Sequence, residues 1–366
     1  MKIVLDNRLP NPIKEYYIAY FDVLGYQAFF KETPDKASEF LTIIHSAITN
    51  TVNYLKSLKD SPLASQFADL HIQSKIFSDN ILLCVEVGKN LKIEKFRIII
   101  FMSLISEIQR KFIVGYRLFL RGGFTKGKMS VNEDYIFGEG LIDAVRIEES
   151  TFHPRIAVSD SVIKYLENVQ IHSQEEVDKA ALIESRVNNG EYISNEEQEF
   201  YQRILQMYNH ELLARILALN LLYKCDDDVW CLSYLYCIDI RTFIPEQALK
   251  QVMEIMKQIS YVDYEKLPKT FPNIDLILKE HKIIIEQKLI KHSDYSLFKT
   301  EDIHNFELQE KILKKYVWAM TYHNYVCDKY KKSDYHINSQ GNCERRHMKL
   351  LIHVFDRDGR IKTTAK

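Results

Sequence analysis

Glycine and proline are scarce in this chain of 366 residues, which contains 11 and 8 of them respectively. This scarcity argues against a collagen-like, linker-rich or low-complexity protein. A basic excess is also missing, because the formal net charge is −1. Proteins whose main task is to grip duplex nucleic acid usually carry such an excess, so we expect no nucleic-acid partner.

Two further absences concern metal-binding cysteines and membrane segments. None of the six cysteines forms a CxxC pair, which excludes a zinc ribbon on spacing. Cys231 and Cys237 share parity in a strand-like run and are expected to be buried. The start of the chain, MKIVLDNRLPNPIKEYY, has no apolar signal-peptide core, and no apolar run is long enough to span a bilayer. We therefore expect a cytoplasmic protein with no membrane partner.

Several common catalytic signatures are absent as well. The chain contains no GxxxxGK[ST], no complete GxGxxG, no HExxH, no GxSxG and no GGDEF sequence. What is present is an ordinary globular composition, with 46% hydrophobic and 27% charged residues. The length is sufficient for one large domain or two modest ones.

Hydrophobic patterning predicts an α+β fold. Strands are expected at 17–24, in the two halves of 71–87, and at 116–131, 134–138 and 155–158. Helices are expected at 35–58, 93–113 and 139–150, with another opening at Ser159-Asp160. The order β-α-β-β-α-β at the start is that of a ferredoxin-like, palm-type core.

The character of the chain changes after residue 168. Residues 174–224 are mostly helical and charged in pattern, 229–239 predict a strong strand, and helices are expected at 245–260, 275–291 and 307–332. The last segment is basic and weakly periodic. We therefore divide the chain into a core, a helical insertion with a returning strand, and a C-terminal helical region with a basic tail, at 14–167, 168–245 and 246–366.

Three segments carry residues suited to phosphate chemistry. FDVLGY at 21–26 places a carboxylate at a strand end before a glycine turn, and KIFSD at 75–79 places another at a hairpin tip. In this strand order the two carboxylates, Asp22 and Asp79, lie on neighbouring strands, where they suit a pair of Mg²⁺ or Mn²⁺ ions. The turn at Gly25 would offer backbone N–H groups to a triphosphate. GEGLIDAVR at 138–146 opens a helix whose Arg146 could neutralise charge on a transferred phosphoryl group.

Together these segments resemble the class III nucleotidyl cyclases. Asp22 and Asp79 match the two metal ligands of that family, and RGGFTKG at 121–127 follows its R-x-G-x-x-x-G strand motif. Gly138 and Arg146 keep the spacing of its helix motif, with Ala144 in place. The resemblance covers about 17–167, and it implies a class III cyclase catalytic core with additional C-terminal helices.

The resemblance also implies roles for individual residues. Two divalent ions, Mn²⁺ or Mg²⁺, would be held by Asp22, Val23 and Asp79. The nucleoside triphosphate substrate would be bound by Gly25, Tyr26, Lys75 and Tyr135. The catalytic residues would be Asp22, Asp79 and Arg146. Since class III domains pair head to tail, we expect a homodimer in which Arg146 reaches the partner's site.

Two departures from the family pattern bear on the base that is bound. Lys75 stands where purine cyclases read the base, but Tyr135 replaces their aspartate and Ile142 replaces an asparagine of the helix motif. The stretch 136–160 looks closer to the pyrimidine cyclases of Pycsar antiphage systems, as does a late helix at 315–326. That likeness implies cyclic UMP or cyclic CMP as product, an antiphage role, and a separate effector that responds to the cyclic nucleotide.

Simpler interpretations and rival functions remain open. Asp22 and Asp79 are also good turn residues, and Lys75 is typical of a solvated edge strand. Arg146 could pair with Glu148 or Glu149. Asp226-Asp227-Asp228 is better interpreted as a solvated turn than as a metal site. The rival functions are a purine cyclase in ordinary signalling, which Lys75 favours, and an inactive palm domain that binds a nucleotide or a protein partner, which Ile142 favours.

Overall fold

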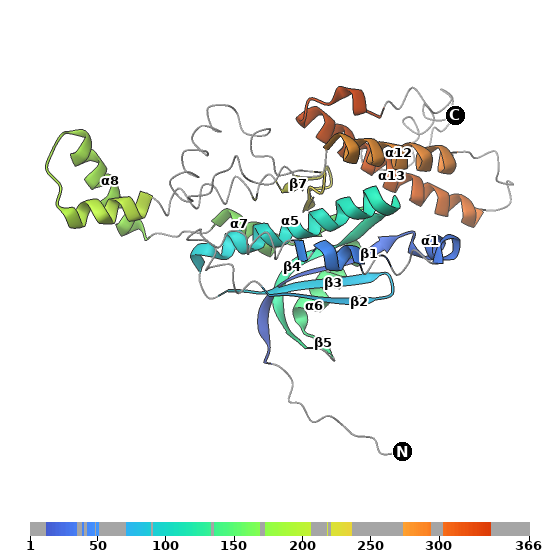
Figure 1. The fold of residues 1–366 in the computed structure, drawn as a ribbon, viewed down its shortest axis with the longest axis horizontal. Helices are drawn as coiled ribbons and strands as arrows, with labels where there is room; N and C mark the ends of the chain where they lie inside the picture. Colours follow the sequence, from blue (N-terminus) through green and yellow to red (C-terminus); the bar gives the residue numbers. More distant parts are fainter. Residues whose placement is uncertain are drawn as a thin grey trace, which may run out of the picture.

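A single mixed sheet forms the centre of the chain in the computed structural model (Figure 1). The structure describes residues 12–34, 39, 42–47, 49–50, 71–88, 91–132, 135–168, 173–205, 218, 221–235, 274–293 and 303–337. Within these ranges the strands form an eight-stranded sheet of order β2-β3-β1-β4-β6-β8-β7, with β5 paired to β4. The predicted α+β class is therefore confirmed.

The elements follow the expected order along the chain. The strands are β1 (Lys14–Leu24), β2 (Ile72–Phe77), β3 (Asn80–Glu86), β4 (Phe119–Val131), β5 (Ile136–Phe137), β6 (Ile156–Val158), β7 (Leu222–Lys224) and β8 (Trp230–Leu232). The helices are α1 (Tyr26–Glu32), α5 (Leu91–Tyr116), α6 (Glu139–Ser150), α7 (Asp160–Asn168), α8 (Gln174–Asn188), α12 (Ile274–Ser293) and α13 (Ile303–Lys329), with a 3₁₀ turn at Ser333–Tyr335. None of the helices described is long and apolar enough to cross a membrane.

The first four long strands have the ferredoxin-like arrangement. β1 lies in the middle, antiparallel to β3 on one side and to β4 on the other, and β2 pairs with β3 outside it. This order confirms the expectation that the first strand and the β2–β3 hairpin are neighbours. β6 then joins β4 in parallel, and β8 and β7 extend the sheet beyond it.

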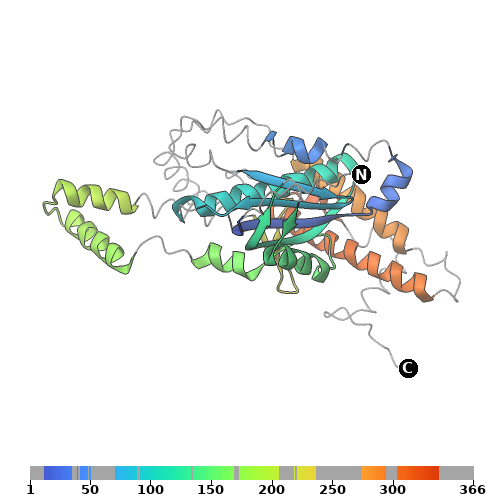
Figure 2. The same ribbon diagram turned by 90° about the horizontal axis from the view of Figure 1, so that it is seen from below.

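Helices cover both faces of this sheet (Figures 1 and 2). Side chains of a strand alternate between faces, so Tyr17 and Phe21 of β1 pack in the core beneath α5, while Ile18 packs in a second core beneath α6. On the α5 side, Phe101 meets Phe124 of β4 edge to face, with ring centroids 5.8 Å apart. Burial on both faces explains why β1 has an apolar run rather than a simple alternation.

Glycines let α6 lie very close to β4. A Cβ added at Gly123 would stand 2.7 Å from the Cβ of Ile147, and one added at Gly127 would stand 2.5 Å from the Cα of Gly140. Gly123 and Gly127 are four residues apart, so both lie on the same face of the strand. The spacing of glycines in 121–127 is therefore required by helix–sheet packing, whatever else the motif does.

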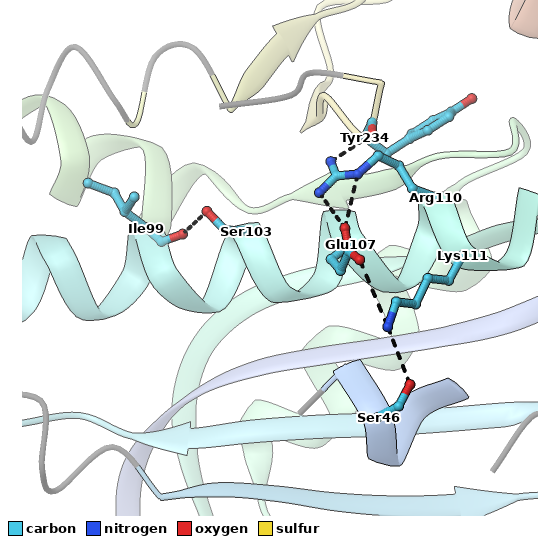
Figure 3. A network of polar contacts seen from close by, with 7 residues as sticks. All are labelled: Ser46, Ile99, Ser103, Glu107, Arg110, Lys111 and Tyr234. Carbon is cyan, nitrogen blue, oxygen red and sulfur yellow. Dashed lines mark hydrogen bonds and ion pairs between the residues drawn. The ribbon is translucent and has the colours of Figure 1, made fainter. Parts of the chain in front are cut away.

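The α12–α13 pair packs at the end of the sheet where β1 ends and β4 begins. Leu24 and Phe119 from these strand ends join a core with Tyr234, Ile285 and Tyr322. Other polar contacts tie α5 to its surroundings (Figure 3). Their distances are 3.1 Å from Arg110 Nη1 to the Tyr234 carbonyl, 3.0 Å from Arg110 Nη2 to Glu107 Oε2, and 3.3 Å from Lys111 Nζ to Ser46 Oγ.

A helical hairpin projects away from the sheet (Figures 1 and 2). It consists of α8 and a second helical segment at 195–205. Ser173 begins α8 with a capping box, in which its hydroxyl accepts from the Glu176 N–H and the Glu176 carboxylate accepts from the Ser173 N–H. Arg186 of α8 pairs with Glu197 of the second segment at 2.6 Å. The helical prediction for this part of 174–224 is confirmed.

The prediction of a long strand at 229–239 is wrong in its length. β8 ends at Leu232, and the chain turns at Tyr234 and Leu235. The reason is burial against α13, because the Leu235 N–H donates to the Tyr322 hydroxyl at 3.1 Å instead of to a neighbouring strand. Cys231 is buried as expected, while Cys237 and the helix predicted at 245–260 lie outside the described residues, as does most of 35–58.

The aspartate run at 226–228 forms a turn, as expected. It connects β7 to β8, and Asp228 has a left-handed φ of 61°. Asp227 is more than a solvated turn residue, however. Its carboxylate accepts two hydrogen bonds, at 2.8 and 2.5 Å, from the buried guanidinium of Arg155.

Candidate functional site

The structure brings Asp22 and Asp79 to the same end of the sheet. Asp22 lies near the end of β1, opposite Asn80 at the start of β3. Asp79 occupies the β2–β3 turn, after Ser78 with its left-handed φ of 62°. The Asp79 carbonyl accepts a 3.1 Å hydrogen bond from the N–H of Val23, so the hairpin tip is fixed directly beside the strand end. Burial raises the pKa of Asp22, and the charge of Asp79 adds to that rise, as expected for two nearby carboxylates.

Asp22 is engaged by an arginine on its other side. Arg121 of β4 stands opposite Asp22 in the strand register. Its Nε and Nη2 donate to the two carboxylate oxygens of Asp22 at 3.2 and 3.1 Å, in a bidentate pair. The same Nη2 also forms an ion pair with Glu148 of α6. Asp22, Arg121 and Glu148 therefore form a continuous network, which we call the Asp22 network.

The electrostatic balance of this network is set by burial. Burial raises the pKa of Asp22, and Arg121 opposes that rise by favouring the charged form. The same two influences, in the same order, act on the pKa of Glu148. Beside them, burial and the neighbouring carboxylates raise the pKa of Tyr20, whose hydroxyl donates to Asn80 Oδ1 at 2.9 Å. Negative charge is thus concentrated at this end of β1.

The turn after β1 has the geometry expected of it. Gly25 adopts φ 83° and ψ 10°, a left-handed conformation that favours glycine. Gly25 precedes α1, and Tyr26 is the first residue of that helix. The Tyr26 ring lies 5.8 Å from the Phe30 ring in centroid distance. The turn therefore lies three residues from Asp22 at the same end of the sheet.

Two other predicted site residues, Lys75 and Tyr135, lie outside the Asp22 network. Lys75 is on β2, the edge strand, where it pairs in register with Leu82 of β3. Tyr135 precedes β5, which pairs with the far end of β4 at Ser130 and Val131. Ten residues of β4 separate Arg121 from Val131, which is about 30 Å along an extended strand. Within one chain, Tyr135 is therefore remote from Asp22.

Arg146 is also not a member of the Asp22 network. Its side chain is 72% exposed, and it forms an ion pair with Asp143 at 3.6 Å, one helical turn earlier. The alternative interpretation, that Arg146 pairs with Glu148 or Glu149, is not the arrangement found, because the ion pair is with Asp143. Glu148 is buried beneath α6 and pairs with Arg121 instead.

The donor set at the strand end suits a divalent cation in type. Two carboxylates and a backbone carbonyl at Val23 are oxygen donors, which Mg²⁺ and Mn²⁺ prefer. Among the described residues, no group of three or more His, Cys, Asp or Glu side chains could hold a metal ion. An ion here would therefore depend on the Asp22–Asp79 pair, with backbone and substrate oxygens completing its coordination.

Sequence reasoning missed two members of this site. Arg121 was singled out only as part of a motif, although a strand register that places it opposite Asp22 would have indicated the pair. Lys315 of α13 was noted only as the first residue of the late helix at 315–326, with no role assigned to it, yet its charge is among those that lower the pKa of Asp22. No local pattern in the sequence connects a residue of this late helix with β1.

Comparison with known proteins finds similarity in solved structures only. No family model matches the chain, and no curated protein matches it. The adenylyl cyclase CyaB from P. aeruginosa is 16% identical with a TM-score of 0.30, covering 43% of this chain and 83% of that one. The monomeric guanylyl cyclase domain of the RhoGC fusion protein from the aquatic fungus Blastocladiella emersonii is 13% identical with a TM-score of 0.32, covering 43% and 89%. At identities and TM-scores this low, the likeness does not bear on function.

Proposed function

We propose that this protein is a nucleotidyl cyclase that converts a nucleoside triphosphate into a 3′,5′-cyclic monophosphate and diphosphate. The observation that supports it best is the juxtaposition of Asp22 and Asp79, fixed by the hydrogen bond from Val23 to the Asp79 carbonyl. Paired carboxylates at a strand end and a hairpin tip are the metal-binding arrangement of the family that the motifs resemble. The fold itself is shared by many functions, so the proposal depends on these side chains.

The chain's own residues have distinct tasks in this mechanism. Asp22, Val23 and Asp79 would hold two divalent ions, Mn²⁺ or Mg²⁺, which supply charge stabilisation at the attacking and leaving oxygens. Burial raises the pKa of Asp22, and a bound cation would offset that rise by favouring the charged carboxylate. Gly25 gives the chain the sharp turn needed for backbone N–H groups to approach phosphate. Arg121 has a second partner in Glu148, so it stays anchored when Asp22 binds a cation.

A homodimer accounts for the residues that lie apart in one chain. Arg146 is exposed and Tyr135 is at the far end of β4, so neither meets Asp22 of its own subunit. A head-to-tail pair would bring the partner's surface to each site, and two equivalent sites would result. The apolar side chains of Phe137 and Ile142, which both precede Arg146 in the sequence, are 46% and 51% exposed and suit burial by a partner.

We further propose a pyrimidine substrate. Tyr135 and Ile142 stand where purine cyclases have an aspartate and an asparagine, and the 136–160 stretch resembles the Pycsar pyrimidine cyclases. The product would be cyclic UMP or cyclic CMP, formed in a cytoplasmic antiphage response and read by a separate effector. A purine cyclase remains the nearest alternative, since Lys75 matches the purine-reading position.

The test is product formation from each of the four nucleoside triphosphates with Mn²⁺, identified by mass spectrometry. We expect cyclic UMP or cyclic CMP from the wild type and none from Asp22→Asn or Asp79→Asn. Arg146→Ala should lower the rate by roughly 10²–10³, the cost of losing one transition-state donor. Asp178→Asn, on the projecting α8, is the matched control and should leave the rate unchanged. Full activity in the Asp79 variant would refute the two-metal assignment, and a purine product would refute the pyrimidine assignment.

One observation favours a non-catalytic alternative. Both carboxylate oxygens of Asp22 are bonded to Arg121 in this structure, which is also a stable arrangement for a palm domain that only binds a nucleotide. Measurable nucleotide binding with no cyclic product from any of the four triphosphates would select this alternative.

A further inference from the structure

The late helix α13 lies against the same end of the sheet as the Asp22 network. Its Tyr316 packs on Phe119 of β4, with ring centroids 6.0 Å apart, and Phe119 is two residues before Arg121. Its Trp318 stacks on His153 at 5.6 Å and 15°, in the segment that follows α6. These contacts place α13 beside β4, the strand that carries Arg121, and beside the segment that directly follows α6.

Lys315 precedes Tyr316 on this helix and contacts the segment that follows α6. Its Nζ lies 5.3 Å from the centre of the Phe152 ring, and Phe152 is four residues after Glu148. Burial and Arg121 lower the pKa of Lys315, whereas Asp22 and Glu148 raise it. Lys315 therefore interacts electrostatically with all three members of the network, and its contact with Phe152 places it beside the end of α6, the helix that carries Glu148.

The position of α13 is fixed by the fold. The Arg155 guanidinium lies 5.8 Å from the Trp318 ring centre, and its other partner is the Asp227 carboxylate at 2.8 and 2.5 Å. Arg155 is buried and directly precedes β6, so the β7–β8 turn, β6 and α13 are connected through one side chain. Lys315 is thereby held on a rigid support, which a binding residue requires.

The charges at this end of β1 indicate what Lys315 does. Asp22, Asp79 and Glu148 carry three negative formal charges, and Arg121 and Lys315 carry two positive ones. A divalent cation held by Asp22 and Asp79 would leave the two cationic side chains with only Glu148. We propose that Lys315 binds the polyphosphate of the nucleotide, so that the C-terminal region completes the site. This inference rests on the proposed function, because it assigns a ligand to the same site.

A purely structural role is the competing explanation. Lys315 could serve only as a counter-ion that keeps Asp22 and Glu148 in place, with no contact to any ligand. The two roles differ in what a neutral variant changes. Loss of a counter-ion lowers the stability of the protein, whereas loss of a phosphate contact lowers the affinity for a polyphosphate and raises KM with a smaller effect on kcat.

The experiment measures binding of inorganic triphosphate to the full chain with Mn²⁺, by calorimetry, without turnover. Lys315→Gln should weaken binding roughly tenfold, the loss expected for one charge-assisted hydrogen bond, while Lys315→Arg should stay within about threefold of wild type. Lys314→Gln is the matched control, because its ammonium pairs with Glu310 at 3.0 Å on the preceding turn. It should bind as the wild type does.

A second measurement needs no variant and covers the case in which Lys315→Gln does not fold. The wild type is treated with an amine-acetylating reagent, with and without triphosphate, and modified peptides are quantified by mass spectrometry. Triphosphate should protect Lys315 and not Lys314. Equal acetylation of Lys315 in both conditions, unchanged affinity in Lys315→Gln, or no binding by the wild type would each overturn the inference.

These outcomes separate the inference from the proposed function. If the wild type makes no cyclic product but triphosphate still protects Lys315, the polyphosphate site stands and the cyclase assignment fails. If the wild type is an active cyclase and Lys315→Gln keeps its triphosphate affinity and KM, the cyclase assignment stands and the role of Lys315 fails.

Discussion

Replacing Arg121 with methionine should destabilise the protein strongly, and more so at high pH. The substitution keeps most of the side-chain volume but removes the guanidinium between Asp22 and Glu148. Those two carboxylates have side chains only 18% and 9% exposed, and Arg121 itself is 24% exposed. Two buried negative charges would then lack the guanidinium that pairs with both of them, and Lys315 makes no ion pair with either in this structure.

The size of the effect follows from this burial. Removing one partner of a buried ion pair costs about 3–5 kcal/mol, because the remaining charge is uncompensated. We expect the lower end of that range, about 3 kcal/mol, because Arg121 retains some contact with solvent. Such a loss would be a large fraction of the roughly 5–15 kcal/mol that stabilises a typical domain.

The loss of stability caused by Arg121→Met should be greater at high pH than at low pH. The pKa values of Asp22 and Glu148 are raised in the folded protein, and Arg121 is what limits the rise. Without Arg121 the folded state binds protons still more tightly than the unfolded state does. Stability of the variant therefore recovers as the pH falls through the folded-state pKa values towards the unfolded values near 4. The deficit relative to wild type should be largest at pH 8 and smaller at pH 5.

The assay is urea unfolding of wild type and Arg121→Met, followed by tryptophan fluorescence, in metal-free buffer at both pH values. The matched control is Arg117→Met, whose ion pair with Glu280 is more exposed and should be worth at most about 1 kcal/mol. Adding Asp22→Asn and Glu148→Gln to the Arg121 variant should restore much of the loss. A deficit below about 1 kcal/mol, or one equal at both pH values, would refute this account of the network.

Two further predictions concern buried histidine and helix packing. Burial lowers the pKa of His323 to about 4, so the unfolded state takes up a proton before the folded state does as the pH falls. His323 should therefore reduce the free energy of unfolding of the wild type by roughly 1.4 kcal/mol for each unit by which the pH decreases from 6.5 to 4. Urea unfolding of His323→Asn should show a shallower slope in that window, and an unchanged slope would contradict the assignment. Gly123→Ala should cost about 1–3 kcal/mol because α6 leaves no room for a Cβ, whereas Gly115→Ala, whose nearest neighbour would be 3.9 Å away, should not destabilise. Equal effects of these two substitutions on thermal unfolding would refute the packing argument.

Features determined by neighbouring residues were predictable from the sequence. The helix expected at 139–150 is α6 to the residue, because its glycine start and amphipathic spacing are local signals. The hairpin tip at Ser78-Asp79-Asn80 was also found, since those residue types favour a tight turn. Once the strands and their order were known, the proximity of Asp22 and Asp79 followed from topology alone.

Features determined by distant contacts were not predictable. β8 is short because the hydroxyl of Tyr322, on a helix far along the chain, takes the N–H of Leu235. The alternating apolar pattern after Leu232 gave no sign of that competition. In the same way, Glu148 looked like a helical partner of Arg146, and only the tertiary packing of α6 on β4 brings it to Arg121.

The Asp22 network relates the two ion pairs of Arg121 to the close packing of α6 on β4. A guanidinium and a divalent cation have the same preference for a carboxylate, so Arg121 satisfies in this structure the charge that a metal ion would satisfy in the proposed reaction. In that reaction Arg121 would keep Glu148 as a partner after Asp22 binds the metal ion. The glycines of the 121–127 motif are what allow α6, and with it Glu148, to approach the strand so closely. The motif therefore combines a packing requirement and an electrostatic one, because the close packing of α6 gives Arg121 its second partner.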